Sequence, residues 1–194
     1  MQYPLLGMKN AEEHCFVRRE VYYKLLEAAS LLPFNYKFKI LDAWRPFDLQ
    51  YELYEKYSID IIKKFHLENC SNEYKKNIIK RFVSEPIANI DNPPVHTTGG
   101  AIDLTIIDEN DKELNMGSQF DEFSKKTYTL YYENRDVDIN TNRLLLYTIM
   151  TKVGFTNLPS EWWHFDFGDN YWSQYTNNPS IYNGIFTKNK IHLF

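Results

Sequence analysis

The sequence predicts a fold of the α+β class, because helical and strand-like segments occur together without the regular alternation of strand and helix that a parallel α/β sheet needs. The 194 residues fit one compact domain of ordinary size, so we expect a single domain over residues 1–194. Hydrophobic residues make up 43% and charged residues 25%, so the chain can fill a core and is not disordered by composition.

The first helix and the first strand follow each other near the N-terminus. Residues 15–32 are expected to form a helix, because apolar side chains recur at steps of three and four and a proline follows. Residues 36–44 alternate as a strand does, with Phe38, Ile40 and Asp42 on one side.

Two further helices and a long loop are expected next. The second helix opens at Pro46 and continues to Ile62, and the third begins after Ser71, a good N-cap, and continues to Phe82. Residues 84–100 contain three prolines and two glycines, so we expect an irregular loop that leads into a strand.

The second half of the chain holds the clearest strand. Residues 101–108 alternate aliphatic side chains with an aspartate and a threonine, and the DENDK stretch that follows predicts a turn. A helix capped by Thr141 or Asn142 is expected to end at Gly154. The aromatic run WWHFDF predicts another strand, and the segment beyond Gly168 has no clear pattern.

Composition also limits the classes of function. The net charge of -4 argues against general nucleic-acid binding. The sequence contains no run of 18 apolar residues, so it predicts no membrane span. The N-terminal residues lack the pattern of a secretion signal. Cys15 and Cys70 lie far apart and outside any CxxC motif, as free thiols do in a reducing compartment. We therefore expect a cytoplasmic protein with neither nucleic acid nor membrane as a partner.

Of the five histidines, two lie in motif-like segments, and we interpret His14, His66 and His192 as surface or hydrogen-bonded residues. His96 lies seven residues before Asp103, with two glycines between them that allow the chain to double back. A carboxylate inside an apolar strand is costly unless it is paired, hydrogen-bonded or bound to a cation. A structural aspartate satisfied by loop amides explains this segment alone equally well.

The second motif-like segment contains Glu161 and His164. A surface glutamate and an aromatic-packed core histidine are the alternative interpretation. Two histidines and an aspartate, His96, Asp103 and His164, form a three-ligand zinc set that leaves a fourth position for water. Glu161, expected at the junction of loop and strand, fits a general base beside that water.

Arg45 follows the strand expected over residues 36–44, and strand ends often carry site residues. Its guanidinium is suited to an oxyanion or a substrate carboxylate. An exposed arginine in a salt bridge is the alternative. Three of the four tryptophans, Trp44, Trp162 and Trp163, flank these segments and are expected to form dry walls around the charged groups.

Together these segments resemble the VanX-type D-alanyl-D-alanine dipeptidases, part of a wider group of zinc D,D-peptidases that share a fold with the hedgehog signalling domain. The resemblance rests on four motifs in order. They are Trp44-Arg45-Pro46, the stretch from His96 to Asp103 with its two glycines, Asn115-Met116-Gly117-Ser118-Gln119-Phe120-Asp121, and Glu161-Trp162-Trp163-His164.

The resemblance implies a small, mainly antiparallel sheet flanked by helices and a catalytic domain with one zinc ion. It implies His96, Asp103 and His164 as the zinc ligands, Glu161 as the general base and Arg45 as the cation that stabilises the transition state. Asp121 would bind the free amino group of a D,D-dipeptide, most simply D-Ala-D-Ala.

One position departs from the family pattern. Pro94 stands where the family often carries a serine that holds the substrate carboxylate, and proline has no side-chain donor. The nearest alternative function is a zinc D,D-carboxypeptidase or endopeptidase acting on peptidoglycan peptides in the cell wall. The second is a non-catalytic, zinc-stabilised binding module, which would need neither Glu161 nor Arg45. Antibiotic resistance, peptidoglycan turnover and nutrient use would employ the same residues.

Overall fold

The computed structural model describes residues 1–89 and 92–187, and it confirms the α+β class. Four strands form an antiparallel sheet in the order β1-β2-β4-β3. Their bounds are Lys37–Asp42 for β1, Ala101–Ile107 for β2, Thr156–Asn157 for β3 and His164–Asp166 for β4. The long central strand β2 therefore pairs with β1 on one side and with β4 on the other.

The strands expected from the sequence are present, with two differences. β1 contains a bulge, because Ile40 lies opposite Leu104 while Asp42 lies opposite Asp103. The extra residue interrupts the simple alternation expected across residues 36–44. In the aromatic run only the last part is a strand, since Trp162 and Trp163 lie in the turn that precedes β4.

Two helices begin at residues other than those expected. α2 spans Arg19–Ser30, because residues 15–18 are extended and bonded to distant backbone: the Trp44 amide donates to the Phe16 carbonyl at 2.8 Å. α5 spans Val137–Lys152 and is capped by Asp136, whose Oδ1 accepts from the Ile139 amide at 3.0 Å. Thr141 and Asn142 lie inside this helix, so their prediction as caps was wrong.

The second and third helices are confirmed. α3 spans Phe47–Lys64 and α4 spans Asn72–Ile79, and the Ser71 hydroxyl accepts from the Tyr74 amide as an N-cap does. The sequence patterns did not reveal three other short helices: α1 over Gln2–Leu5, η2 over Lys125–Thr127 and α6 over Asn170–Thr176. The loop expected over residues 84–100 contains a further short 3₁₀ helix, η1, over Val95–Thr98.

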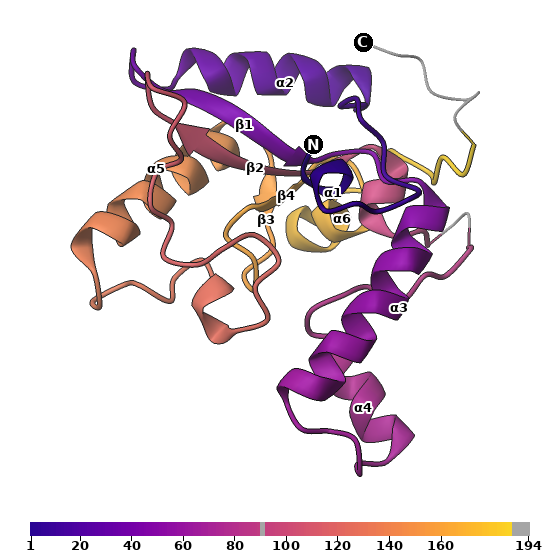
Figure 1. Cartoon of the computed structure of the whole chain (residues 1–194). Helices are drawn as coiled ribbons and strands as arrows, with labels where there is room; N and C mark the ends of the chain where they lie inside the picture. The colour runs from indigo at the N-terminus through magenta and orange to yellow at the C-terminus, as the bar shows by residue number, and fades with distance from the viewer. Residues whose placement is uncertain (90–91, 188–194) are drawn as a thin grey trace.

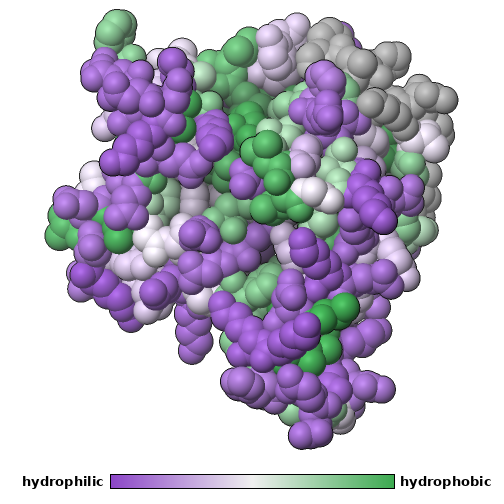
Figure 2. All heavy atoms as spheres, in the orientation of Figure 1, coloured by the Kyte–Doolittle hydropathy of each residue, from purple (hydrophilic) through white to green (hydrophobic). Residues whose placement is uncertain are grey.

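The helices fall into two groups by their position relative to the sheet. α2 lies along β1, whereas α3 and α4 form an arm that extends away from the sheet (Figure 1). The main hydrophobic cluster combines strand residues with side chains of α2 and α5, and a second cluster fills the contact between α1, α3 and α4. Figure 2 shows hydrophilic side chains over much of that arm and hydrophobic ones near the centre of the same face.

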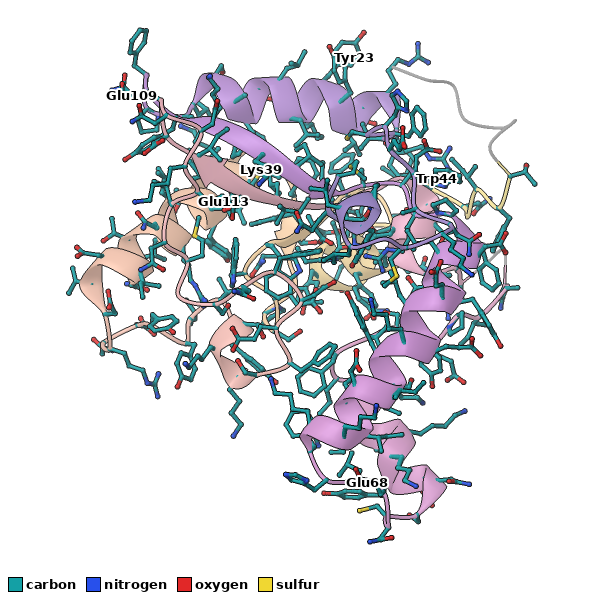
Figure 3. The ribbon with its side chains drawn as sticks, in the orientation of Figure 1. Tyr23, Lys39, Trp44, Glu68, Glu109 and Glu113 are labelled. Carbon is teal, nitrogen blue, oxygen red and sulfur yellow. The ribbon has the colours of Figure 1, made fainter. Side chains whose placement is uncertain are left out.

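The turn after β2 is confirmed and anchored to β1. The Asp108 carboxylate accepts from the Asn110 and Lys112 amides, which closes the turn. Glu113 then returns beside β1, where it pairs with Lys39 at 2.6 Å (Figure 3). Within the described residues, none of the helices combines the length and apolar character that a membrane crossing requires. His192 lies outside the described residues.

Candidate metal centre and substrate pocket

The sheet brings the three expected ligand residues together. Asp103 on β2 pairs with His164 on β4, so their side chains lie on the same face of the sheet. His96 lies on η1, and Gly99 ends this helix with a φ of 73° that returns the chain toward β2. Gly100 serves a different need, since a Cβ there would lie 2.5 Å from the Phe167 carbonyl oxygen.

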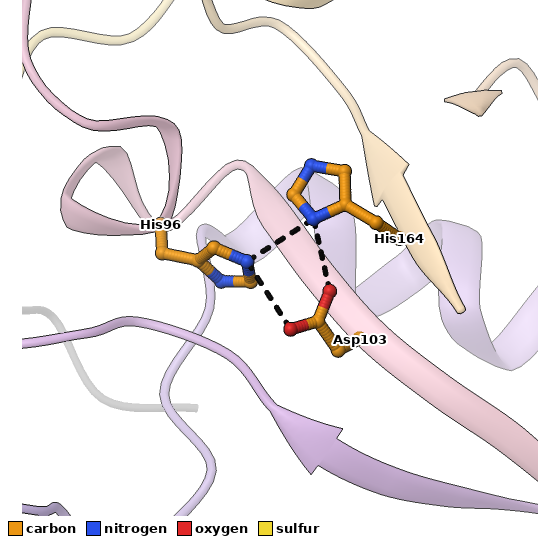
Figure 4. Close-up of side chains that lie close together, drawn as sticks. All are labelled: His96, Asp103 and His164. Carbon is orange, nitrogen blue, oxygen red and sulfur yellow. Dashed lines mark hydrogen bonds and ion pairs between the residues drawn. The ribbon is translucent and has the colours of Figure 1, made fainter. Parts of the chain in front are cut away.

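The distances within this cluster match the edges of a coordination tetrahedron (Figure 4). His96 Nε2 lies 3.2 Å from His164 Nδ1 and 3.3 Å from an oxygen of Asp103, and His164 Nδ1 lies 2.9 Å from the other oxygen. Ligands bound to zinc at about 2.0–2.1 Å in a tetrahedron lie about 3.3 Å apart. The two histidines approach different oxygens of Asp103, and one atom from each of the three side chains lies within 4.8 Å of the others, which is close enough for them to share one metal ion.

The remaining ring nitrogens fix which atoms face the cluster. His96 Nδ1 lies 2.8 Å from the Ala43 carbonyl oxygen, which only accepts, so this nitrogen carries the proton and Nε2 presents a lone pair. His164 Nε2 lies 2.8 Å from Asp166 Oδ1, which orients Nδ1 toward the cluster in the same way. His96 Nε2, His164 Nδ1 and the Asp103 carboxylate therefore converge and are the atoms that would bind a cation.

The charge of Asp103 supports this interpretation. Burial raises the pKa of its carboxyl group, but the charges and hydrogen bonds of His96 and His164 lower it by more than burial raises it. The pKa of Asp103 therefore lies well below its usual range. Asp103 is therefore an ionised ligand candidate despite being buried.

A pair of buried aspartates lies behind His164 and was missed in the sequence. Asp166 and Asp169 have 0% of their surface exposed, and burial together with the Asp166 charge raises the pKa of Asp169 well above its usual range. Asp169 Oδ1 also caps α6 by accepting from the Trp172 amide. The sequence contained one signal, because residues two apart on a strand share a face, as His164 and Asp166 do.

Arg45 is buried, with 8% of its surface exposed, and is not the exposed arginine of the alternative interpretation. Its Nε donates to Asp42 at 2.8 Å, Nη1 donates to Gln50 Oε1 at 2.8 Å, and Nη2 donates to the Tyr3 hydroxyl at 3.2 Å. Burial lowers the pKa of Arg45, but Tyr3, Asp42 and Asp103 raise it above its usual value. The guanidinium therefore remains charged, 3.8 Å from Asp103 Oδ2.

Asp121 lies near Arg45, because the Tyr3 hydroxyl contacts both side chains. The hydroxyls of Tyr3 and Tyr57 each donate to Asp121 Oδ2 at 2.8 Å. Burial raises the pKa of Asp121 to about 6, although Arg45 and the two phenols act to lower it. Both phenols use one oxygen, so Oδ1 is left for another donor.

Glu161 occupies the loop-to-strand junction, as expected. Its Oε2 lies 4.0 Å from His164 Nδ1, and its side chain is 23% exposed. Burial, with smaller contributions from Asp103 and Asp121, raises the pKa of Glu161 to about 8, while His164 and Arg45 act to lower it. The carboxyl group therefore lies beside the candidate metal position and titrates close to neutrality.

A cavity of about 270 Å³ connects these groups. All six candidate residues line it: Arg45, His96, Asp103, Asp121, Glu161 and His164. Within the described ranges none of the three tryptophans expected as walls lines this cavity, but Trp163 lines a smaller one together with Asp121 and Glu161. Trp44 instead donates to the Ile185 carbonyl and packs beside Phe16.

A buried His-Asp-His cluster with a carboxylate beside it and a small cavity in front of it defines the metallopeptidase class of site. Residues 5–181 match the D-ala-D-ala dipeptidase family, which is a family of metallopeptidases, and the chain belongs to that family.

Two relatives carry the same description. The chain is 30% identical to a D-alanyl-D-alanine dipeptidase of Synechocystis sp. over 154 residues, which cover 72% of this chain and 62% of the relative. It is 45% identical to a D-alanyl-D-alanine dipeptidase of Escherichia coli over 71 residues, which cover 37% of this chain and 36% of the relative. In both cases the match spans less than two thirds of the relative's own length.

Proposed function

We propose that this chain hydrolyses D-alanyl-D-alanine, or a closely related D,D-dipeptide, at a single zinc ion. The observation that carries the proposal is the cluster of His96, Asp103 and His164, whose ligand atoms lie 2.9 to 3.3 Å apart in a cavity that also contains Glu161 and Arg45. Membership of the dipeptidase family and the names of the two relatives support the choice of substrate.

The donor atoms favour zinc over a harder cation. His96 would bind through Nε2, His164 through Nδ1 and Asp103 through its carboxylate, and this mixture of nitrogen and oxygen ligands suits zinc better than magnesium or calcium. A bound zinc ion lowers the pKa of a water ligand from 15.7 to about 7 and polarises a carbonyl group.

Glu161 performs the proton transfers in this proposal. Its carboxylate accepts a proton from the attacking water and later delivers that proton to the nitrogen of the leaving D-alanine. Burial and neighbouring carboxylates raise the pKa of Glu161, which makes its carboxylate a stronger base that can hold the proton between the two steps. The 4.0 Å from Glu161 Oε2 to His164 Nδ1 keeps the carboxylate beside the ligands without making it one of the three closest.

Arg45 and Asp121 act on different groups of the substrate. The Arg45 guanidinium stabilises negative charge on the carbonyl oxygen, and its bonds to Asp42, Gln50 and Tyr3 hold it in place before the reaction. Asp121 Oδ1 accepts from the substrate ammonium, while the two phenols on Oδ2 orient the carboxylate. An ammonium at this position selects a dipeptide, because a longer peptide has a neutral amide there.

We also propose that residues 1–194 act as one catalytic domain in the cytoplasm. Phe120 packs against both hydrophobic clusters, so the arm and the sheet share a contact beside Asp121. Cys15 and Cys70 are free thiols, as a reducing compartment favours.

The test compares D-alanine release from D-Ala-D-Ala and from a pentapeptide that ends in D-Ala-D-Ala, with and without a metal chelator. We expect preference for the dipeptide and loss of activity with the chelator. Preference for the pentapeptide would support a carboxypeptidase instead. A protein that binds zinc but hydrolyses neither peptide would support a binding module.

A further inference from the structure

Arg143 on α5 is the largest of the fully buried side chains that the structure describes, with 2% of its surface exposed. Burial lowers its pKa to about 10, which still leaves the guanidinium charged at neutral pH. A buried charge is costly unless its donors are bonded, so its presence indicates a specific demand. That demand is not contact with the substrate, since the described lining of the main cavity does not include Arg143.

The guanidinium of Arg143 closes the base of a loop. Nε donates to the Met116 carbonyl at 2.7 Å, where the loop starts. Nη1 donates to the Tyr128 carbonyl at 2.6 Å and Nη2 to the Lys126 carbonyl at 2.7 Å, where the loop ends. We call residues 116–128 the Asp121 loop; all of them are described, and η2 is the only regular element among them. One planar group therefore holds both ends of an otherwise irregular segment.

Asp121 lies in the middle of this loop, five residues after Met116 and five before Lys126. Its backbone has a φ of 58°, in the left-handed region that a residue other than glycine keeps only where its surroundings fix it. Its carboxylate meets two phenols from outside the loop, those of Tyr3 and Tyr57. The direction of the carboxylate therefore depends on where the two ends of the loop are held.

The same loop is joined to the turn that carries Glu161. The Trp162 amide donates to the Thr127 carbonyl at 2.9 Å, and Trp162 Nε1 donates to Ser118 Oγ at 2.9 Å. Arg143 Nη2 lies 3.4 Å from the same Ser118 oxygen, and the guanidinium carbon lies 5.8 Å from the centre of the Trp162 ring. Arg143 thus contacts both the Asp121 loop and the residue next to Glu161.

We propose that Arg143 is the positioning residue of the ammonium pocket, and that it fixes the Asp121 loop so that the Asp121 carboxylate lies at the distance from the candidate metal centre that a dipeptide spans. The inference rests on the proposed function, because it deepens the role given there to Asp121. Three carbonyl oxygens that converge repel one another unless a donor lies between them, and a guanidinium supplies a donor to each at once. Its mounting on α5, which packs into the main hydrophobic cluster, keeps this donor in place.

The test replaces Arg143 by lysine, which keeps the positive charge but has a single nitrogen in place of the fork. D-alanine release is measured from D-Ala-D-Ala and from N-acetyl-D-Ala-D-Ala, which has no ammonium. We expect Arg143→Lys to lower kcat/KM for the free dipeptide by about tenfold to a hundredfold, mainly through KM, because a binding group is displaced. The acetylated dipeptide should lose far less. Zinc content should stay at the wild-type level, since the bonds of Arg143 go to the Asp121 loop and not to a ligand residue.

A double-mutant cycle separates positioning from a general weakening of the fold. If Arg143 acts through Asp121, adding Arg143→Lys to Asp121→Asn should lower kcat/KM for the free dipeptide by less than about threefold further. Additive losses would overturn the proposal, because they would show that the two residues act independently. An equal loss on the free and the acetylated dipeptide in Arg143→Lys would overturn it as well.

Arg135→Lys is the matched control. Arg135 is an exposed arginine that donates to the Tyr131 carbonyl, outside the Asp121 loop. The same replacement there should leave both rates unchanged. Losses in Arg135→Lys equal to those in Arg143→Lys would contradict the proposal, because they would not depend on the Asp121 loop.

Tyr132→Phe is a milder second variant, which decides the question if Arg143→Lys does not fold. The Tyr132 phenol donates to the Gly117 carbonyl at 2.7 Å, beside the start of the loop, and its ring lies 4.9 Å from the Arg143 guanidinium carbon. We expect a loss of about threefold to tenfold on the free dipeptide, as removal of one neutral hydrogen bond gives, and little loss on the acetylated one. Unchanged rates on both substrates, or equal losses, would overturn the proposal.

Failure of this inference is distinguishable from failure of the proposed function. If the wild-type protein, loaded with zinc, hydrolyses neither substrate, the proposed function is wrong and the role of Arg143 falls with it. If the wild type hydrolyses the free dipeptide and the variants keep its discrimination against the acetylated one, only the role given to Arg143 is wrong. Melting temperatures, measured for every variant, identify a loss of fold.

Discussion

Replacing Asp121 by asparagine removes the charge proposed to hold the substrate ammonium while keeping the shape of the side chain. The pKa of about 6 leaves the wild-type carboxylate more than nine-tenths ionised at pH 7.5. Its two phenol donors both approach Oδ2 at 2.8 Å, so the amide oxygen of asparagine can keep them and the change falls on the position of Oδ1. A hydrogen bond to a charged group contributes about 1.5–3 kcal/mol.

That range corresponds to a loss of roughly tenfold to 150-fold in kcat/KM for D-Ala-D-Ala. The assay compares this dipeptide with N-acetyl-D-Ala-D-Ala, which has no ammonium, at pH 7.5. We expect Asp121→Asn to lose rate on the free dipeptide and to reduce the discrimination between the two substrates. Tyr57→Phe is the comparison variant, because it removes one donor and keeps the charge, and its loss should be smaller. A change below about threefold, or an equal loss on both substrates, would refute the assignment of Asp121.

Three further predictions follow from the same contacts. Arg45→Ala should lower kcat by about a hundredfold to a thousandfold or more, as loss of an oxyanion donor does. Arg45→Lys should not restore kcat, because a single ammonium cannot reach Asp42, Gln50 and Tyr3 together. Steady-state kinetics test both variants, and near-normal kcat in either one would contradict the role given to Arg45. Asp166→Asn should weaken zinc binding by about tenfold to a hundredfold, and unchanged affinity in a chelator competition would contradict the support given to His164. The pKa of Asp121 is about 6 in the folded state and 3.8 in the unfolded chain, so the folded state holds this proton more tightly. The contribution of Asp121 to the unfolding free energy should therefore fall by at most about 3 kcal/mol as pH rises from about 4 to 6. Unfolding free energies from denaturant titrations, plotted against pH, should fall more steeply for the wild type than for Asp121→Asn, and parallel plots would exclude this effect.

The ligand candidates could be predicted because each is encoded locally. His96 and Asp103 flank a glycine pair, of which Gly99 turns the chain and Gly100 allows the close approach of Phe167, and Asp103 is the one charged residue in an apolar strand. His164 lies beside Glu161 in a short aromatic segment. The fold then needed only to place β4 beside β2 for these residues to meet.

The groups that support the site could not be predicted in the same way. Tyr3 reaches Asp121 across 118 positions in sequence, from a helix of four residues that has no apolar period to detect. Asp42 faces Asp103 because of a bulge, and alternation alone does not reveal a bulge. These contacts depend on how separate elements pack, which no local pattern records.

The helix boundaries that differed have similar causes. α5 begins with Val137, which is 80% exposed, and in its first turn only Ile139 is buried, so the apolar pattern is clear only from later turns. α6 has no buried residue, so it shows no apolar period at all. Phe16 and Val17 are buried as a helix face would be, but the backbone of Phe16 and Arg18 bonds to the distant residues Trp44 and Gly99.

The central claim is that the cluster of His96, Asp103 and His164 holds one zinc ion that is required for dipeptide hydrolysis. The most direct measurement removes metal from the purified protein with a chelator and then follows D-alanine release from D-Ala-D-Ala as zinc is added back in known amounts. We predict that activity rises in proportion to zinc and reaches its plateau at one equivalent per chain, and that Glu161→Ala binds the same equivalent without turnover. Full activity in the metal-free protein, or one equivalent of bound zinc without any hydrolysis by the wild type, would contradict the claim.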